Sequence, residues 1–207
     1  MWARWPRGPP ERVGGVSVAA LVLAAGGGRR YGMPKALVEH EGSLFVERAV
    51  RTARAACDPV LVVLGAAMVE VWQRADLDGA TVVGNREWET GMASSLRTGI
   101  QGLQALGSGI EAVLVLLVDV PGMTPETLHR LAGHAAADAL VVPTYDGVRG
   151  HPVLLGRDHW AGVLAGATGD EGARTYLAEH AAEVVEVDCT GLADPTDWDV
   201  PPGSVQT

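Results

Sequence analysis

A glycine-rich stretch with several basic residues follows the first apolar run of the chain. Residues 21–35 read LVLAAGGGRRYGMPK, so the apolar run stops at three glycines, and two arginines, a fourth glycine and Lys35 come next. Glycines let backbone N–H groups approach an anion closely, and Arg and Lys side chains neutralise its charge. This loop therefore indicates a phosphate-binding site, and a solvated glycine-rich turn is the alternative interpretation.

Two common phosphate-binding motifs do not fit the loop. The Walker A pattern GxxxxGK[ST] finds its glycines at Gly27 and Gly32, but Met33 stands where lysine is required. The dinucleotide pattern GxGxxG, started at Gly26, meets Tyr31 in place of its third glycine. What remains is the pattern L-A-A-G-x-x-x-R-x-G-x-x-K, which is spelled by Leu23, Ala24, Ala25, Gly26, Arg30, Gly32 and Lys35.

A carboxylate follows the most apolar segment of the chain. Residues 112–118, AVLVLLV, contain no polar side chain, as a central parallel strand requires, and Asp119 comes directly after them. Thr124 and Pro125 supply an N-cap and a first-turn proline for the next helix, so Asp119 is not needed as a cap. Mg²⁺ prefers one or two carboxylates together with phosphate oxygens, which makes Asp119 a candidate metal ligand.

Apolar strands alternate with amphipathic helices along the chain, which is typical of an α/β fold with a mostly parallel sheet and right-handed crossovers. We expect strands at residues 16–25, 60–64, 81–83, 112–118, 139–142, 153–155 and 184–187. We expect helices at residues 44–56, 67–75, 92–106, 125–137 and 171–180, with Ser43 and Asp170 as N-caps of the first and last. Ligands of such sheets bind beyond the carboxyl ends of the strands, where the loop at 26–35 and Asp119 are expected to meet.

Composition limits the classes of protein to consider. The chain has 207 residues, 47% hydrophobic and 20% charged, which suits one soluble domain. Its net charge of −9 argues against a general nucleic-acid surface, and no apolar run reaches the roughly 18 residues that span a membrane. Cys57 and Cys189 are isolated, so we expect free thiols in a reducing compartment, the cytoplasm. We expect a flexible extension at 1–15 without the apolar region of a signal peptide, a single domain at 16–200 and a flexible tail at 201–207.

Five stretches of the chain together resemble the MobA-like nucleotidyltransferases, which transfer NMP from an NTP. The first is the loop described above, in which Gly28 stands where the family usually has serine. The others are NREWETGMASSL (85–96), LLVDVPGMT (116–124), YDGVRGHPVLL (145–155) and TGDEGARTYL (168–177). The resemblance covers residues 18–198 and implies a Rossmann-like three-layer α/β/α nucleotidyltransferase fold.

The resemblance also implies roles for particular residues. Arg30, Lys35 and Asp119 would be catalytic, and Asp119 would hold Mg²⁺. The nucleotide would be bound by Leu23, Ala24, Ala25, Gly26, Gly27, Gly28, Lys35, Asn85, Ser94 and Ser95, and the acceptor substrate by His151, Asp170 and Arg174. The late acidic stretch DCTGLADPTDW (188–198) implies Asp194 as a second metal carboxylate, with Asp188 and Asp197 as alternatives.

The motifs LAAG and GMASSL resemble the branch of the family that acts on molybdopterin with CTP. The implied reaction transfers CMP to a phosphorylated acceptor, molybdopterin, with pyrophosphate as leaving group and transient contact with a molybdenum enzyme or its chaperone. One alternative is a sugar-phosphate nucleotidylyltransferase, which has a similar loop but a larger sugar domain. The other is a non-catalytic nucleotide-binding or cofactor-handover protein, which would not need both Lys35 and Asp119.

Overall fold

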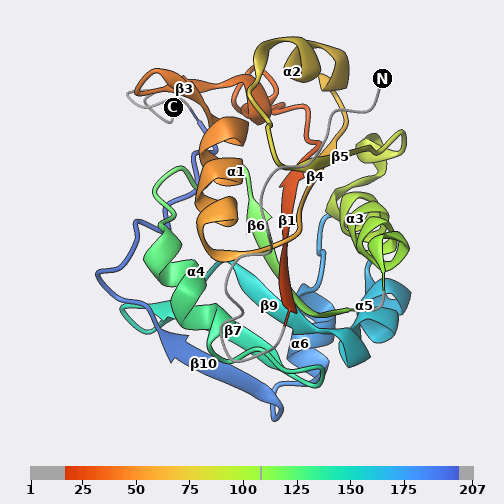
Figure 1. Ribbon diagram of the computed structural model, residues 1–207, viewed down its shortest axis with the longest axis vertical. Helices are drawn as coiled ribbons and strands as arrows, with labels where there is room; N and C mark the ends of the chain where they lie inside the picture. The colour runs from red at the N-terminus through yellow and green to blue at the C-terminus, as the bar shows by residue number, and fades with distance from the viewer. Residues whose placement is uncertain (1–16, 108, 201–207) are drawn as a thin grey trace.

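An eight-stranded mixed sheet lies at the centre of the computed structural model, which describes residues 17–107 and 109–200 (Figure 1). Its strands lie in the order β10 (Val184–Asp188), β7 (Leu140–Tyr145), β9 (Val153–Gly156), β6 (Ile110–Leu117), β1 (Ser17–Ala24), β4 (Val60–Leu64) and β5 (Thr81–Gly84), and β8 (Val148–Arg149) pairs with β7. Parallel pairing joins β6, β1, β4 and β5, and also β7 and β10, whereas β9 is antiparallel to both its neighbours. The predicted mostly parallel α/β sheet is confirmed.

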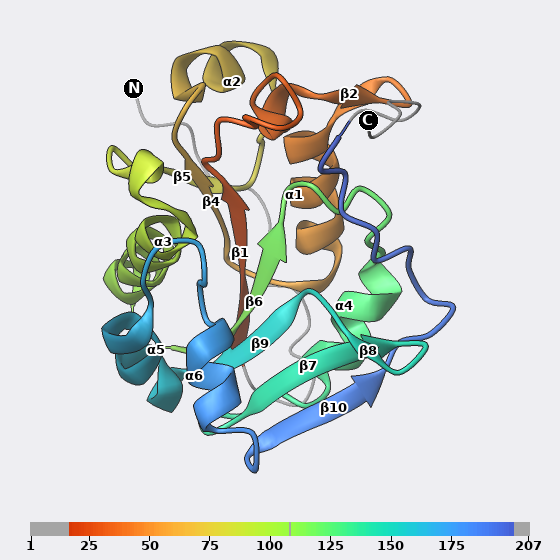
Figure 2. The same ribbon diagram turned by 180° about the vertical axis from the view of Figure 1, so that it is seen from behind.

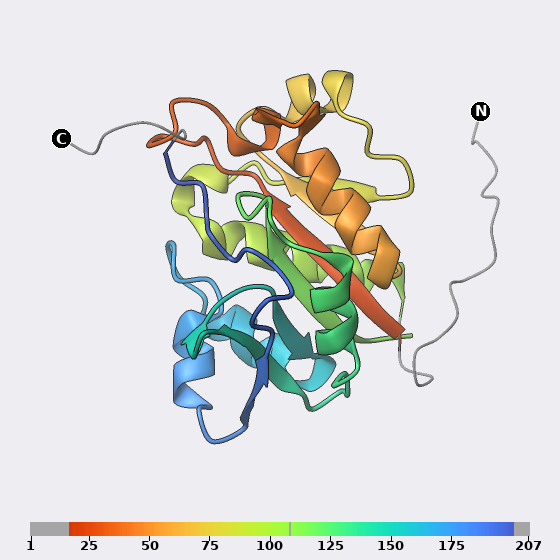
Figure 3. The same ribbon diagram turned by 90° about the vertical axis from the view of Figure 1, so that its left-hand side faces the viewer.

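Helices cover both faces of this sheet and make three layers (Figures 2 and 3). One face is covered by α1 (Phe45–Ala56), α2 (Met68–Arg74) and α4 (Pro125–Ala132), and the other by α3 (Met92–Leu106), α5 (Trp160–Gly166) and α6 (Arg174–Glu179). The smaller elements are the hairpin of β2 (Glu39–His40) and β3 (Ser43–Leu44) and the 3₁₀ turns η1 (Lys35–Leu37), η2 (Trp88–Thr90) and η3 (Arg157–His159).

The apolar sequence of β1 follows from burial on both faces. Ala20 and Val22 face the core beneath α1 and α4, whereas Ala19 and Leu21 face the core beneath α3. All four side chains are fully buried. Side chains of a strand alternate between its two faces, so a strand with helices on both sides must be apolar throughout.

Several local predictions were wrong, and backbone geometry explains them. Ser43 lies in β3 and does not cap α1, whose first turn is closed by Leu44 N–H donating to Glu47. The helix expected from residue 171 begins only at Arg174, because Gly172 has φ of +56°, which a right-handed helix excludes. Thr124, in contrast, caps α4 as predicted, with its Oγ1 accepting from the Thr127 N–H.

The extents of two further segments also differ from expectation. Helix α4 ends at Ala132 instead of residue 137, and α5 was not expected from the sequence. The predicted extension at 1–15 and tail at 201–207 lie outside the described residues. None of the helices in the described part of the chain is long and apolar enough to cross a membrane.

Strand order places the two predicted chemical segments side by side. From β1 the chain continues to β4 on one side, while β6 pairs on the other side with Leu23 opposite Leu117. The loop after β1 and Asp119 after β6 therefore leave the sheet at neighbouring positions, where the order of strands reverses. This is where ligands of open α/β sheets bind.

The loop after β1 turns back on itself at Gly28. This residue has φ of +61°, and its carbonyl accepts a hydrogen bond from the Gly32 N–H at 2.8 Å. A Cβ atom at position 28 would overlap the Met33 carbonyl oxygen. Glycine is therefore required here by the backbone, which gives a physical reason for the departure from the serine of the usual pattern.

We expect Gly28→Ala to destabilise the protein more than Gly32→Ala does. Both glycines have positive φ, but a Cβ at Gly32 would meet no atom within 4 Å. Gly32→Ala should lose about 1 kcal/mol of unfolding free energy, and Gly28→Ala about 3 kcal/mol or more. Urea unfolding of both variants measures this difference. Equal losses would show that the loop can relax around the added methyl group.

Candidate active site

A cleft of about 840 Å³ opens at the carboxyl ends of β1 and β6. This is within the range of roughly 300–1,000 Å³ that is usual for small-molecule sites. Its lining includes Gly26, Gly27, Gly28, Arg30, Lys35, Trp88, Ser95, Asp119, Gly150, His151, Asp170, Arg174, Asp197 and Asp199. The fold thus brings together most of the residues that the sequence analysis selected.

The side chain of Lys35 lies between two carboxylates at the base of the glycine-rich loop. Its Nζ donates to Asp119 Oδ2 and to Asp199 Oδ1, both at 2.7 Å, and the side chain is only 14% exposed. Burial by itself lowers the pKa of Lys35, but the hydrogen bonds to Asp119 and Asp199 outweigh it, and the pKa is raised. The hydrogen bond from Lys35 in turn lowers the pKa of Asp199. At neutral pH this is an ammonium held by an ionised carboxylate.

Asp199 was not among the residues selected from the sequence. It also pairs with Arg30, whose guanidinium lies 2.6 Å from Asp199 Oδ2 but is 76% exposed. The preceding residue anchors the segment, because the Trp198 N–H donates to the Asp119 carbonyl and the indole packs edge-on against His40 and Phe45. The spacing of residues 119 and 199 along the chain does not predict this contact. The sequence signal is that Asp199 directly follows the late acidic stretch at 188–198.

The three carboxylates proposed for the late acidic stretch lie in different places. Asp194 closes a turn by accepting from the Thr196 N–H, and it is not part of the cleft lining. Hydrogen bonding by the Thr196 side chain, followed by that of its backbone, lowers the pKa of Asp194. Asp188, at the end of β10, accepts from the Thr190 N–H and is also outside the lining, whereas Asp197 is part of it. In residues 17–107 and 109–200 no cluster of three or more His, Cys, Asp or Glu is arranged to hold a metal.

Asn85 and Ser94, predicted to face a nucleoside, use their side chains within the protein. The Asn85 amide donates to Ser94 Oγ at 2.8 Å and to Ser95 Oγ at 3.0 Å, and its Oδ1 accepts from the Glu87 N–H at 2.9 Å. All three side chains are 5% exposed, and only Ser95 lines the cleft. Asn85 and Ser94 therefore shape the turn before α3.

The predicted acceptor-binding residues line the same cleft as the glycine-rich loop. Asp170 Oδ1 accepts from the Met92 N–H at 3.2 Å, and the Gly169 carbonyl accepts from Ala93, so this loop satisfies the first turn of α3. His151 and Arg174 line the cleft. Burial lowers the pKa of His151, Asp119 and Asp197 partly counter this, and Arg174 lowers it further, so the imidazole is neutral at pH 7.

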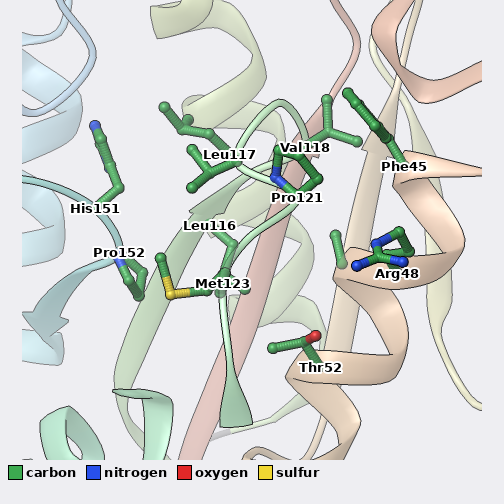
Figure 4. A pocket seen from close by; sticks show the side chains of 12 residues that line it. Phe45, Arg48, Thr52, Leu116, Leu117, Val118, Pro121, Met123, His151 and Pro152 are labelled. Carbon is green, nitrogen blue, oxygen red and sulfur yellow. The ribbon is translucent and has the colours of Figure 1, made fainter. Parts of the chain in front are cut away.

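His151 also borders a second, much smaller cavity. Figure 4 shows His151 and Pro152 on one side of this cavity and Arg48 of α1 on the other. Its volume of about 10 Å³ is barely enough for one water molecule. The buried His151 Nδ1 has no hydrogen-bond partner within the described residues. The large cleft is therefore the place for a substrate.

Comparison with known proteins places this cleft in context. Residues 20–184 match the model of the MobA-like NTP transferase domain. A nicotine blue oxidoreductase from Paenarthrobacter nicotinovorans is 33% identical, covering 88% of this chain and 92% of the relative. A probable molybdenum cofactor guanylyltransferase from Geobacillus sp. is 29% identical, covering 57% and 58%, and the molybdenum cofactor cytidylyltransferase from Escherichia coli is 21% identical, covering 68% and 71%.

A solved structure shares the fold over most of its length. The manganese complex of Rv0371C from Mycobacterium tuberculosis superposes with a TM-score of 0.72 at 27% identity, covering 85% of this chain and 90% of the other. That structure is a complex with manganese, a divalent cation.

Replacing Lys35 by methionine should destabilise the protein in a pH-dependent way. Losing charge-assisted hydrogen bonds to two carboxylates should cost about 1.5–3 kcal/mol at pH 7. The depressed pKa of Asp199 stabilises the fold above the ordinary pKa of 3.8, and the raised pKa of Lys35 does so below 10.5. The difference from the parent should therefore shrink as pH falls below about 4 or rises above about 10.5.

Denaturant unfolding of parent and variant across that pH range is the measurement. Arg30→Met is the matched control, because Arg30 pairs with the same carboxylate from an exposed position and should cost less than about 1 kcal/mol. A penalty that stays constant from pH 3 to pH 8 would mean that Lys35 stabilises by packing alone.

Proposed function

The chain belongs to the MobA-like NTP transferase family, and from that premise we propose that it transfers NMP from an NTP to a phosphorylated acceptor. The observation that carries this proposal is Lys35, held between Asp119 and Asp199 directly below a glycine-rich loop. A module that only binds nucleotides has no need of an ammonium flanked by two carboxylates. A lysine between two carboxylates next to a glycine-rich loop suits a site that binds a triphosphate together with a divalent cation.

In the proposed reaction an oxygen of the acceptor's phosphate attacks the α-phosphorus of the NTP. The bond from that phosphorus to the bridging oxygen breaks, and pyrophosphate leaves with the electron pair. The backbone of Gly26–Gly28 and the side chains of Arg30 and Lys35 would hold the triphosphate and neutralise the charge that develops on pyrophosphate. Positioning and charge neutralisation supply the rate, and no side-chain nucleophile is needed.

The carboxylates beside Lys35 fit a divalent cation. Asp119 Oδ2 and Asp199 Oδ1 each lie 2.7 Å from the same ammonium, so two carboxylate oxygens already converge on one positive charge. Mg²⁺ typically binds one or two carboxylates and completes its shell with phosphate oxygens and water. A bound Mg²⁺ would neutralise phosphate charge and polarise the α-phosphate. We assign the second carboxylate to Asp199, with Asp194, Asp188 and Asp197 of the late acidic stretch as the alternatives, of which Asp197 lines the cleft.

The substrates we propose are CTP and molybdopterin. Ala25 in the LAAG motif and the GMASSL segment support CTP. The relatives include both a guanylyltransferase and a cytidylyltransferase, so GTP is the natural competitor. His151 and Arg174, which also line the cleft, are proposed to bind the acceptor. The product would pass to a molybdenum enzyme or its chaperone, in the cytoplasm, which agrees with two buried free thiols, Cys57 and Cys189.

A second candidate function is reduction of a heterocyclic dye. It is favoured by the relative named as a nicotine blue oxidoreductase, which is 33% identical over 92% of its own length. A cleft built for a nucleoside pyrophosphate can also accommodate a dinucleotide that carries a hydride. The two functions differ in whether a phosphoanhydride bond is broken.

We expect pyrophosphate release when the protein is given CTP, Mg²⁺ and molybdopterin. Asp119→Asn should lower kcat/KM at least about a hundredfold. It should also lower the melting temperature by a few degrees, because Asp119 is one of the two carboxylates that hold Lys35, so the assay is run well below the melting temperature of the variant. The assay compares CTP with GTP, ATP and UTP. A parallel assay follows oxidation of a reduced nicotinamide dinucleotide in the presence of nicotine blue. If the protein reduces the dye and releases no pyrophosphate with any of the four NTPs, the transferase proposal is wrong.

The second carboxylate can be identified from metal affinity. Asp199→Asn should weaken binding of Mn²⁺ in the presence of a non-hydrolysable CTP analogue roughly tenfold or more. Asp194→Asn should change it less than about twofold, because that carboxylate is engaged by Thr196 outside the cleft. Titration calorimetry measures both variants. The reverse ranking would restore Asp194 as the ligand.

A further inference from the structure

The chain after β10 returns to the cleft and forms no helix or strand up to residue 200. Figure 3 shows this segment running from β10 past the loop that follows β6 toward the β2–β3 hairpin. Two backbone hydrogen bonds fix it there, from the Asp194 N–H to the Gly122 carbonyl at 3.2 Å and from the Trp198 N–H to the Asp119 carbonyl at 2.9 Å. The backbone that carries Asp199 is therefore held beside Asp119.

Asp199 uses both of its carboxylate oxygens on cations of the glycine-rich loop. Its Oδ1 accepts from Lys35 Nζ at 2.7 Å, and its Oδ2 lies 2.6 Å from the Arg30 guanidinium. Arg30 and Lys35 are the two side chains that would hold the triphosphate in the proposed function. Ammonium and guanidinium groups bind carboxylate and phosphate oxygens in the same way. Asp199 thus takes contacts that an incoming phosphate would need.

Asp119 differs from Asp199 in this respect. In the described part of the chain Asp119 forms an ion pair with Lys35 alone, whereas Asp199 pairs with both Lys35 and Arg30. One of the three ammonium hydrogens of Lys35 remains for a ligand, and the Arg30 side chain is 76% exposed, so phosphate can reach both cations. A phosphate that does so meets the negative charge of Asp199 between them, and like charges about 4 Å apart repel even in water.

We infer that Asp199 is an internal competitor of the nucleotide's phosphates, and that a divalent cation relieves this competition by binding the Asp199 carboxylate. This inference rests on the proposed function, in which Asp199 is the second metal carboxylate. The consequence is a coupling between two ligands, because the cation and the triphosphate each bind more tightly when the other is present. Without the cation, the cleft neutralises its own basic residues and binds small polyanions poorly.

Titration calorimetry with inorganic triphosphate tests this coupling, once with EDTA and once with excess Mg²⁺. In EDTA, Asp199→Asn should bind inorganic triphosphate roughly five- to tenfold more tightly than the parent, because a repelling charge is removed and both cations are released. In Mg²⁺ this gain should disappear. The variant should fold, since Lys35 keeps Asp119 as a partner, and Asp199→Ser replaces it if it does not.

Glu89→Gln is the matched control, because it also removes one negative charge from the lining of the cleft. Glu89 forms no ion pair in residues 17–107 and 109–200. Its variant should bind inorganic triphosphate in EDTA within about twofold of the parent.

Three results would overturn the inference. An unchanged or weakened affinity of Asp199→Asn in EDTA would mean that Asp199 orders the two cations instead of competing for them. An equal gain in Glu89→Gln would mean that net charge alone explains the effect. A gain of the same size in EDTA and in Mg²⁺ would mean that the cation does not act through Asp199.

The measurement involves no transfer reaction, so the two proposals can fail separately. The expected gain in a protein that transfers nothing refutes the proposed function alone. The absence of that gain in an active transferase refutes this inference alone.

Discussion

The structure depends on one partly buried positive charge that holds three distant parts of the chain together. The Lys35 ammonium hydrogen-bonds to Asp119 after β6 and to Asp199 near the C-terminal end of the described chain, while Lys35 itself follows the loop after β1. An ammonium this little exposed must be paired, so the carboxylates are as necessary to the fold as to any chemistry. The same pairing places the Lys35 ammonium and the carboxylates of Asp119 and Asp199 in the lining of the cleft. In the proposed function, the carboxylates would bind a metal ion and the ammonium would contact a triphosphate.

Around this charge, the cleft is shaped by contacts that no single element could make. The segment that carries Asp199 is anchored through Trp198, whose backbone reaches Asp119 and whose indole packs on Phe45. On the other side, residues 169–170 satisfy the first N–H groups of α3. The N–H groups of Met92 and Ala93 at the start of α3 are therefore already paired within the protein.

The predictions from sequence were correct mainly for structure that is set by residues close to one another in the chain. The strands, the helices with clear apolar periodicity and the Thr124 cap were local in this sense. Apart from local errors such as the Ser43 cap and the bounds of α4 and α6, the sequence misjudged a residue whose partner is remote. Asp170 looks like a cap for the helix that follows it, but it caps α3 instead, 78 positions away. Asn85 and Ser94, which stay predicted nucleotide ligands, form hydrogen bonds with each other and with the turn that precedes α3.

By itself the sequence determined an α/β fold, a glycine-rich loop next to basic residues and a carboxylate at the end of an apolar strand, because each is encoded in the local order of residue types. Only the tertiary structure decided which polar groups remain free to meet a substrate. Whether a carboxylate faces Lys35, as Asp199 does, or closes a turn, as Asp194 does, depends on where the chain passes after β10. Hydrogen-bonding groups are satisfied by whatever lies within about 3 Å, and that neighbourhood is set by packing across the whole sheet rather than by spacing along the chain.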